Sequence, residues 1–158
     1  MINLGFNSGK DMPNVYVELS PIDRILEGLV ILLMAAAWVL AIVFYFDSPL
    51  PSSRLFIGPC AMIVFTVVFI WASRAPIRLY NFPVKLNERN YVMQYVIASR
   101  FTRVVNLIGN LTLFCTLLIE LEAQLNVSQG LFTIFMHVTV GLLLLSFVGY
   151  YILAFRSR

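Results

Sequence analysis

The chain has 158 residues, of which 60% are hydrophobic and 12% charged, with a net charge of +3 and a mean hydropathy of +0.87. A soluble globule of this size cannot bury so much apolar surface, so the composition excludes an ordinary water-soluble domain and predicts a membrane protein. The basic excess favours contact with anionic membrane lipids, and the absence of an aromatic-and-basic module argues against nucleic acid as a partner.

Residues 1–19 precede the first apolar run and show no sustained periodicity. Residues 15–19 alternate like a short strand, but a lone strand would have nothing to pair with. We therefore predict a flexible N-terminal tail over residues 1–19, followed by a single transmembrane domain over residues 20–158.

The first helix has a clear start signal. Ser20 is an N-cap residue, Pro21 suits the first helical position, and Asp23 takes the acidic place of a capping box, where the helix dipole favours its charge. The pattern predicts a helix from about residue 21 and a membrane span over about residues 25–46.

Three further apolar runs predict spans over about residues 55–73, 100–120 and 131–155. At a helical rise of about 1.5 Å per residue, such runs match a hydrocarbon core of about 30 Å. They are apolar on every face, unlike the alternating strands of a membrane barrel. The predicted fold is all-α: an integral membrane four-helix bundle.

The basic residues predict the orientation of this bundle. Ten of the eleven Lys and Arg residues lie near the termini or in the 74–103 segment, whereas Arg54 alone lies on the other side. Because basic residues stay on the cytoplasmic side, both termini are predicted to be cytoplasmic. Asn87 can cap a helix that begins in the cytoplasm and continues into the third span.

Polar residues form a stripe on this third helix. Arg103, Asn106 and Asn110 fall within a wedge of about 120° when residues are placed at helical spacing. They either line a hydrated path or partner groove, because polar groups in a bilayer are costly, or they serve the structure. In the second case the Asn pair bonds across helices and Arg103 extends to the headgroups.

His137, the only histidine, lies at a depth similar to that of Asn110 and is either part of a proton-binding cluster or a structural hydrogen-bond partner. Without a second His, a Cys pair or an intramembrane acid, it predicts no metal, cofactor or catalytic site. Cys60 and Cys115 also share a depth, where a disulfide is chemically possible, although buried cysteines commonly serve as small packing residues.

The polar segment before the third span is a candidate docking surface. Its start as a basic cytoplasmic helix favours contact with lipid or protein. The residues selected for this role are Lys85, Arg89, Gln94, Tyr95 and Arg100.

The same segment resembles the connection between the second and third membrane helices of small bacterial proteins with the SdpI-like domain. The matching positions are Asn81, Pro83, Val84, Lys85, Asn90, Gln94, Tyr95, Arg100 and Arg103. The Pro-x-His-aromatic-Asn run of those relatives is replaced here by "SPLPSSRLFIGP". The resemblance implies a four-helix protein of the bacterial inner membrane, in a broad class that includes immunity to a secreted toxin and signalling.

Three functions are compatible with these features. The leading hypothesis is a non-enzymatic membrane protein that binds a protein partner or a second copy of itself, as accessory subunit, immunity factor or sensor. The alternative is a transporter or channel subunit that uses the polar stripe on the third helix. A minor alternative is a small membrane enzyme that acts on lipid or glutathione adducts.

Overall fold

The computed structural model describes residues 7–9, 12–13, 15, 17–47, 52–125 and 130–157. Its long helices are α1 (Pro21–Asp47), α2 (Ile57–Ser73), α3 (Tyr91–Leu125) and α4 (Leu131–Arg156). The short elements are the strands β1 (Asn7–Ser8) and β2 (Asn81–Phe82) and the 3-10 turns η1 (Ser53–Phe56) and η2 (Ile77–Leu79).

All four long helices, with η1 counted as part of the second, are long and apolar enough to cross a membrane. This result confirms the prediction of an all-helical protein with four helices long and apolar enough to span a membrane. With 35 residues, α3 is about 52 Å long at 1.5 Å per residue, so it exceeds a hydrocarbon core of about 30 Å.

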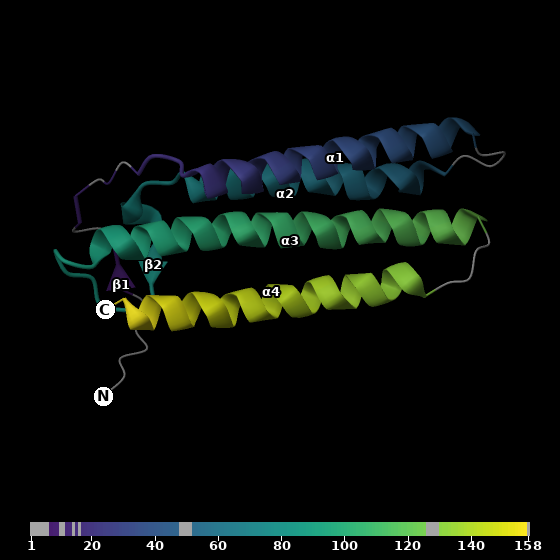
Figure 1. The fold of residues 1–158 in the computed structure, drawn as a ribbon. Coiled ribbons are helices and arrows are strands. Elements are labelled where there is room, and N and C mark those ends of the chain that lie inside the picture. Colours follow the sequence, from purple (N-terminus) through teal and green to yellow (C-terminus); the bar gives the residue numbers. More distant parts are fainter. Residues whose placement is uncertain are drawn as a thin grey trace.

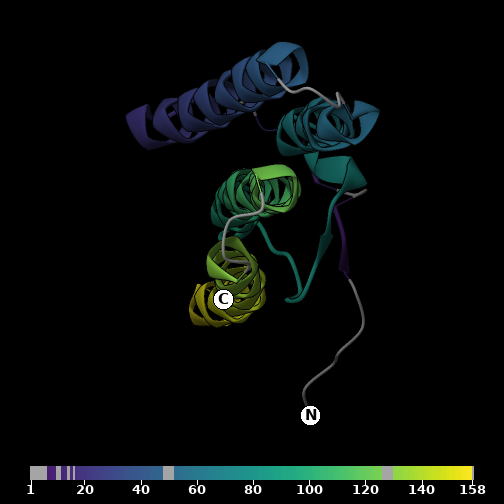
Figure 2. The ribbon, with the colours of Figure 1, turned by 90° about the vertical axis from the view of Figure 1, so that its right-hand side faces the viewer.

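The helices lie side by side in an elongated molecule, with α3 in the middle (Figure 1). The end-on view shows α1 and α2 on one side of α3 and α4 on the other (Figure 2). Helix α3 packs against each of the others, whereas α4 packs against α3 and not appreciably against α1 or α2. The described helices therefore form a group of three with a fourth helix attached to its central member.

The predicted start of the first helix is confirmed. The Ser20 backbone N–H donates to the Asp23 carboxylate at 3.0 Å, and the Asp23 N–H donates back to the Ser20 hydroxyl at 3.3 Å. These reciprocal bonds satisfy donors that every helix start leaves open. They also fix the position of Asp23 at the end of α1.

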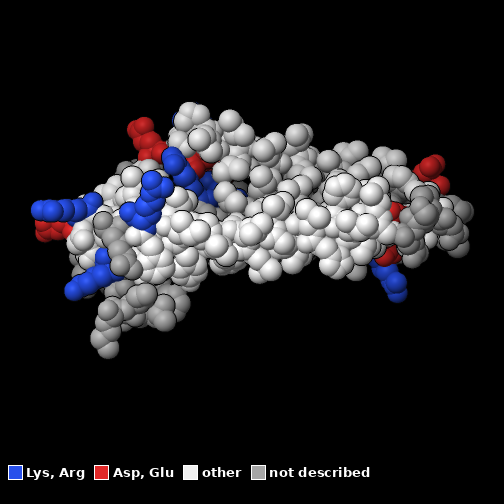
Figure 3. Space-filling model, turned by 60° about the horizontal axis from the view of Figure 1, so that its bottom comes forward, with Lys and Arg blue, Asp and Glu red and all other residues white. Residues whose placement is uncertain are grey.

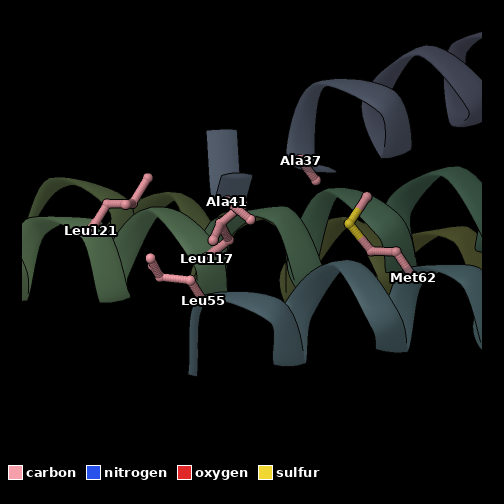
Figure 4. Close-up of a cluster of buried hydrophobic side chains, with 6 residues drawn as sticks. All are labelled: Ala37, Ala41, Leu55, Met62, Leu117 and Leu121. Atoms are coloured by element: carbon pink, nitrogen blue, oxygen red, sulfur yellow. The ribbon is translucent and has the colours of Figure 1, made fainter. Parts of the chain in front are cut away.

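Small residues let α1 approach its neighbours. Ala37 and Ala41 are fully buried, and their short side chains allow close helix contact where α1 meets α2 and α3. Figure 4 shows the cluster that they form with larger side chains from η1, α2 and α3, namely Leu55, Met62, Leu117 and Leu121.

A glycine sets the contact between α2 and α3. A Cβ atom at Gly109 would lie 2.4 Å from two atoms of the Phe65 ring, which itself stacks on Phe69. Only a residue without a side chain fits under this ring in its present place.

One end of the molecule carries most of the described basic residues, and we call it the basic end (Figure 3). Strand β1 pairs there with β2, and the Gly9 N–H donates to the Tyr80 carbonyl at 3.2 Å. A Cβ at Gly9 would lie 2.2 Å from the Ile77 carbonyl oxygen, so the backbone approach requires glycine. Residues 7–9 of the expected flexible tail are thus docked, and the other residues of 1–19 are outside the described part or form no strand.

The charge distribution separates the two ends from the middle. Figure 3 shows a broad belt without charged side chains between the two ends. Large apolar side chains are exposed on the helices, for example Leu32, Leu144 and Leu145, each at least 65% exposed. This belt is the surface that a bilayer would cover.

We expect Gly109→Val to lower the free energy of unfolding by about 1–3 kcal/mol, because the added side chain displaces the Phe65 ring. Unfolding in mixed detergent micelles measures the loss, and Phe65→Leu in the same chain should restore part of it. Gly149→Ala is the matched control, since a Cβ there meets nothing within 4 Å. Equal effects of the two glycine substitutions would contradict this account.

Candidate functional site

The strongest polar feature of the structure is a group of five charged side chains at the basic end, which we call the arginine cluster. Helix α1 supplies two acids one helical turn apart, and the bases come from the end of α2 and from α3. Its members are Asp23, Glu27, Arg74, Arg100 and Arg103.

Arg103 is the centre of this cluster. Its Nε lies 3.1 Å from Glu27 Oε1 and its Nη1 lies 3.5 Å from Asp23 Oδ1, while Nη1 also donates to the Ser99 hydroxyl at 2.8 Å. The side chain is 7% exposed, Asp23 6% and Glu27 14%. The guanidinium group in this position joins α1 to α3 and is almost entirely covered by protein.

The other two arginines lie at the edge of the cluster. Arg74, just after α2, places Nη2 2.6 Å from Glu27 Oε2, and the Nε of Arg100 lies 3.7 Å from Asp23 Oδ1. Their side chains are 53% and 48% exposed. Three cations thus face two anions, which leaves one positive charge in excess at an accessible edge.

Burial explains why the pairing is so complete. An unpaired charge in an apolar environment costs several kcal/mol, and a guanidinium cannot lose its proton at any ordinary pH. Each carboxylate uses both oxygens: Asp23 also accepts two bonds from Ser20, and Glu27 divides its oxygens between Arg74 and Arg103. The charges therefore stabilise the helix contacts that bring them together.

Side chains that follow α2 in the sequence satisfy the open carbonyls at its end. The Ser99 hydroxyl donates to the Ser73 carbonyl at 2.7 Å, and the Tyr95 hydroxyl donates to the Ala75 carbonyl at 3.0 Å. The Tyr80 hydroxyl donates to the Ala72 carbonyl, and burial raises the pKa of Tyr80 to about 12. Tyr80 is consequently protonated, and able to donate, at neutral pH.

A cavity of about 490 Å³ opens beside the arginine cluster. Its walls come from the segment before α1, from the end of α2 and from α3. Apolar walls are formed by Val15, Val17, Leu19, Pro76 and Val96, and the polar lining includes Glu18, Asp23, Ser73, Arg74, Tyr95, Ser99, Arg100 and Arg103.

The predicted polar stripe is divided between two separate sites. Arg103 belongs to the arginine cluster, whereas the Asn110 side-chain amide donates to the Asn106 carbonyl and side chain at 2.9 Å. The Thr66 hydroxyl of α2 donates to Asn110 Oδ1 at 3.3 Å. Within the described residues, no hydrogen bond joins Arg103 to either asparagine, so the pair acts as a polar contact between α2 and α3.

His137 lies apart from these residues. Its side chain is exposed, and Nδ1 lies 2.7 Å from the carbonyl oxygen of Thr133 in the same helix. The contact between α3 and α4 at this level is made by Thr112 and Thr139, whose hydroxyls are 2.9 Å apart. His137 is therefore not brought together with Arg103 or the asparagine pair.

The two cysteines are both free thiols, Cys60 exposed and Cys115 buried. In the described part of the chain, no group of three or more His, Cys, Asp or Glu side chains is close enough to hold a metal ion.

The five candidate docking residues divide into two groups. Lys85, Arg89 and Arg100 are exposed, but Gln94 is fully buried and Tyr95 is 7% exposed. Gln94 Nε2 donates to the Ala154 and Ser157 carbonyls at 2.9 and 3.1 Å, so it closes the end of α4. Gln94 and Tyr95 therefore serve the interior, and only the basic members face outward.

Sequence reasoning missed Glu27 and assigned Asp23 to capping alone. Their spacing of four residues puts both acids on one helix face at the start of the first span, level with the expected position of Arg103. This spacing of two acids is the feature of the sequence that could have identified Glu27 as a partner of Arg103. Asn87 was predicted to cap the third helix, and its Oδ1 accepts from the Arg89 and Asn90 backbone N–H groups at 2.9 Å, in the turn that leads into α3 at Tyr91.

No protein-family model, curated protein or solved structure matches this chain. The arrangement itself therefore has to indicate the function. It offers a buried ionic centre at Arg103, two half-exposed arginines beside it and a cavity with mixed apolar and charged walls.

We expect Arg103→Gln to lower the free energy of unfolding by about 3–5 kcal/mol, because two nearly buried carboxylates lose their shared cation. Arg74→Gln removes the same charge from a half-exposed position and should cost about 1 kcal/mol or less. Unfolding in mixed detergent micelles measures the loss of unfolding free energy in each variant. Losses of similar size would show that Arg103 is not the central partner.

Asn110→Leu should lower the free energy of unfolding by about 1–3 kcal/mol, because it leaves the buried Thr66 and Asn106 without their partner. His137→Ala should change it by less than about 0.5 kcal/mol, since the ring is exposed. The same unfolding measurement tests both, and the reverse ranking would contradict the positions described here.

Proposed function

We propose that the protein is a non-enzymatic integral membrane protein that binds a partner protein at its basic end. The observation that carries this proposal is the cavity of about 490 Å³ beside the arginine cluster. A segment of the partner would place an apolar side chain against Val17 and Val96, and its polar groups would meet the exposed edges of Arg74 and Arg100.

The composition of the cavity supports binding. Protein interfaces combine an apolar centre with a polar rim, and arginine is common among the residues that dominate their affinity. Here the apolar walls lie next to two half-exposed arginines whose carboxylate partners are shared with Arg103. The rim also carries the Glu18 carboxylate, so a partner segment would meet charged groups of both signs.

The hydrogen bonds and ion pairs of the acidic side chains favour a binding role over a catalytic one. A general acid or base has to exchange a proton with its substrate. Asp23 and Glu27 instead have both of their oxygens occupied by Ser20 or by arginines. Their role in the structure is to hold the cavity walls in place.

The orientation that we propose follows from the basic residues. The basic residues of this end lie in the connection from α2 to α3, in the first half of α3 and at the end of α4, and those parts adjoin in Figure 1. They are Arg74, Arg78, Lys85 and Arg89 in the connection, Arg100 and Arg103 in α3, and Arg156 in α4. Arg54 lies at the opposite end of α2. By the positive-inside rule, the basic end and both termini face the cytoplasm.

We also propose a bacterial inner-membrane protein of the SdpI-like kind, as the resemblance over residues 80–103 implies. The positions that carry the resemblance have roles at the basic end. Asn90 Nδ2 donates to the Lys85 carbonyl, Gln94 closes α4, and Arg103 centres the arginine cluster. A shared pattern in this segment is therefore compatible with a shared structure of the basic end. The partner would differ from one such protein to another, and this protein would act as an accessory subunit, an immunity factor or a sensor.

Site-specific photocrosslinking in native membranes tests the proposal. A photoreactive residue at Val96, in the cavity wall, should give a discrete crosslinked protein, whereas one at Leu144, 65% exposed on α4, should not give the same product. Val17→Arg in the Val96 variant should remove the product, because the long charged side chain occupies the apolar wall.

The control variants distinguish binding in the cavity from a general effect of surface charge. Arg89→Gln alters an exposed base outside the cavity and should leave the crosslink unchanged. A crosslink to a second copy of the chain would identify the partner as the protein itself. If Val96 gave no protein adduct, and purification in mild detergent returned only single chains, the proposed function would be wrong.

A further inference from the structure

A second cavity of about 570 Å³ lies between α3 and α4 near the basic end. It is separate from the cavity beside the arginine cluster in all its lining residues except Arg100. Because α4 packs against α3 and not appreciably against the other helices, this groove lies along a contact that only two helices form.

Two arginines from different helices line the groove. Arg100 comes from α3, and Arg156 comes from the last turn of α4. Arg156 is exposed and has no ion pair within the described residues. Arg100 lies 3.7 Å from Asp23, but that carboxylate also serves the more buried Arg103. The groove therefore has an excess of positive charge.

The rest of the groove is open and mostly apolar, with Ser146, Tyr150 and Ser157 as its other polar residues. Phe101, Val104 and Leu153 line it, together with Gly149, where a Cβ would meet nothing within 4 Å. Val104 is one turn further along α3 than Arg100, and Gly149 is two turns before Arg156 on α4, so the apolar part extends from the arginines toward the middle of the molecule. Its shape is that of a polar mouth with an apolar channel.

We propose that this groove binds one anionic phospholipid. The phosphate would lie between the guanidinium groups of Arg100 and Arg156, and an acyl chain would lie along Val104 and Gly149. Guanidinium groups bind phosphate through charge-assisted, often paired hydrogen bonds, and basic pockets between membrane helices suit anionic headgroups. The charge complementarity and the apolar channel identify a lipid, because a free phosphate would use the mouth alone.

This proposal does not depend on the proposed protein partner. The bound lipid would connect α4 to α3 at the end where Gln94 already closes α4. It would thus add a second link between a helix with one neighbour and the rest of the protein. Loss of the lipid site need not alter the cavity wall at Val96.

Lipid titration of delipidated protein, followed by native mass spectrometry, tests the proposal. The probe is dioleoyl phosphatidylglycerol, and dioleoyl phosphatidylcholine is the neutral-headgroup comparison. We expect one phosphatidylglycerol to bind at least about tenfold more tightly than phosphatidylcholine, since two cations face its phosphate and no ammonium group offsets the charge. Equal affinity for the two lipids would overturn the proposal.

A charge-matched pair of variants locates the site. The double variant Arg100→Gln, Arg156→Gln should lose most of the preference for phosphatidylglycerol, a decrease of about tenfold or more. The double variant Arg54→Gln, Arg89→Gln removes the same charge outside the groove and should stay within about twofold of the unmodified protein. If both pairs lose the preference equally, it reflects overall charge, and the site is elsewhere.

A third variant tests the channel without altering charge. Gly149→Leu places a side chain in the open space and should weaken phosphatidylglycerol binding, whereas Gly149→Ala should weaken it less. Inorganic phosphate in excess should not displace the lipid. Full displacement by inorganic phosphate, or unchanged binding in Gly149→Leu, would replace the lipid assignment with a simple anion site. Thermal unfolding of each variant separates lost binding from lost structure.

Discussion

The contact of Arg103 with Asp23 and Glu27 is the interaction on which the rest of the structure depends. A permanently charged group on the central helix requires an anion wherever water is excluded, and α1 provides two at the correct level. This requirement fixes the height of α1 relative to α3. Arg74 then joins the end of α2 to Glu27, which Arg103 also contacts. One ionic cluster thus sets the relative positions of three helices.

The polar segment around residues 78–103 mainly completes the ends of neighbouring helices. Tyr80, Tyr95 and Ser99 donate to carbonyls at and just beyond the end of α2, and Gln94 does the same for α4. Backbone groups at helix ends have no partner within their own helix. Where such ends are shielded from water, side chains of neighbouring segments have to supply the bonds. Much of the polarity that looks like a binding surface in the sequence is thereby used inside the protein.

The sequence predicted those features that depend on local chemistry. The spans follow from apolar runs, and the caps at Ser20 and Asn87 follow from residue type and spacing. The partners of Arg103 depend on which helices adjoin, and apolar runs contain no such information because their faces are nearly uniform. His137 was grouped with Asn110 by depth alone, yet depth does not specify the direction in which a side chain points around its helix. Glu27 escaped attention because a single acid beside a span is ordinary until its cation is known.

The wide separation of the ionic partners along the chain has a consequence for biosynthesis. Glu27 precedes Arg74 by 47 residues and Arg103 by 76, and Asp23 precedes Arg103 by 80. At about 5–20 residues per second, the ribosome needs roughly 4–16 s to make the stretch between Asp23 and Arg103. If α1 enters the bilayer during that interval, it does so with carboxylates that lack their final counter-ion. Their place at the end of α1, where headgroups and water remain within reach, lets insertion proceed before the cation has been synthesised.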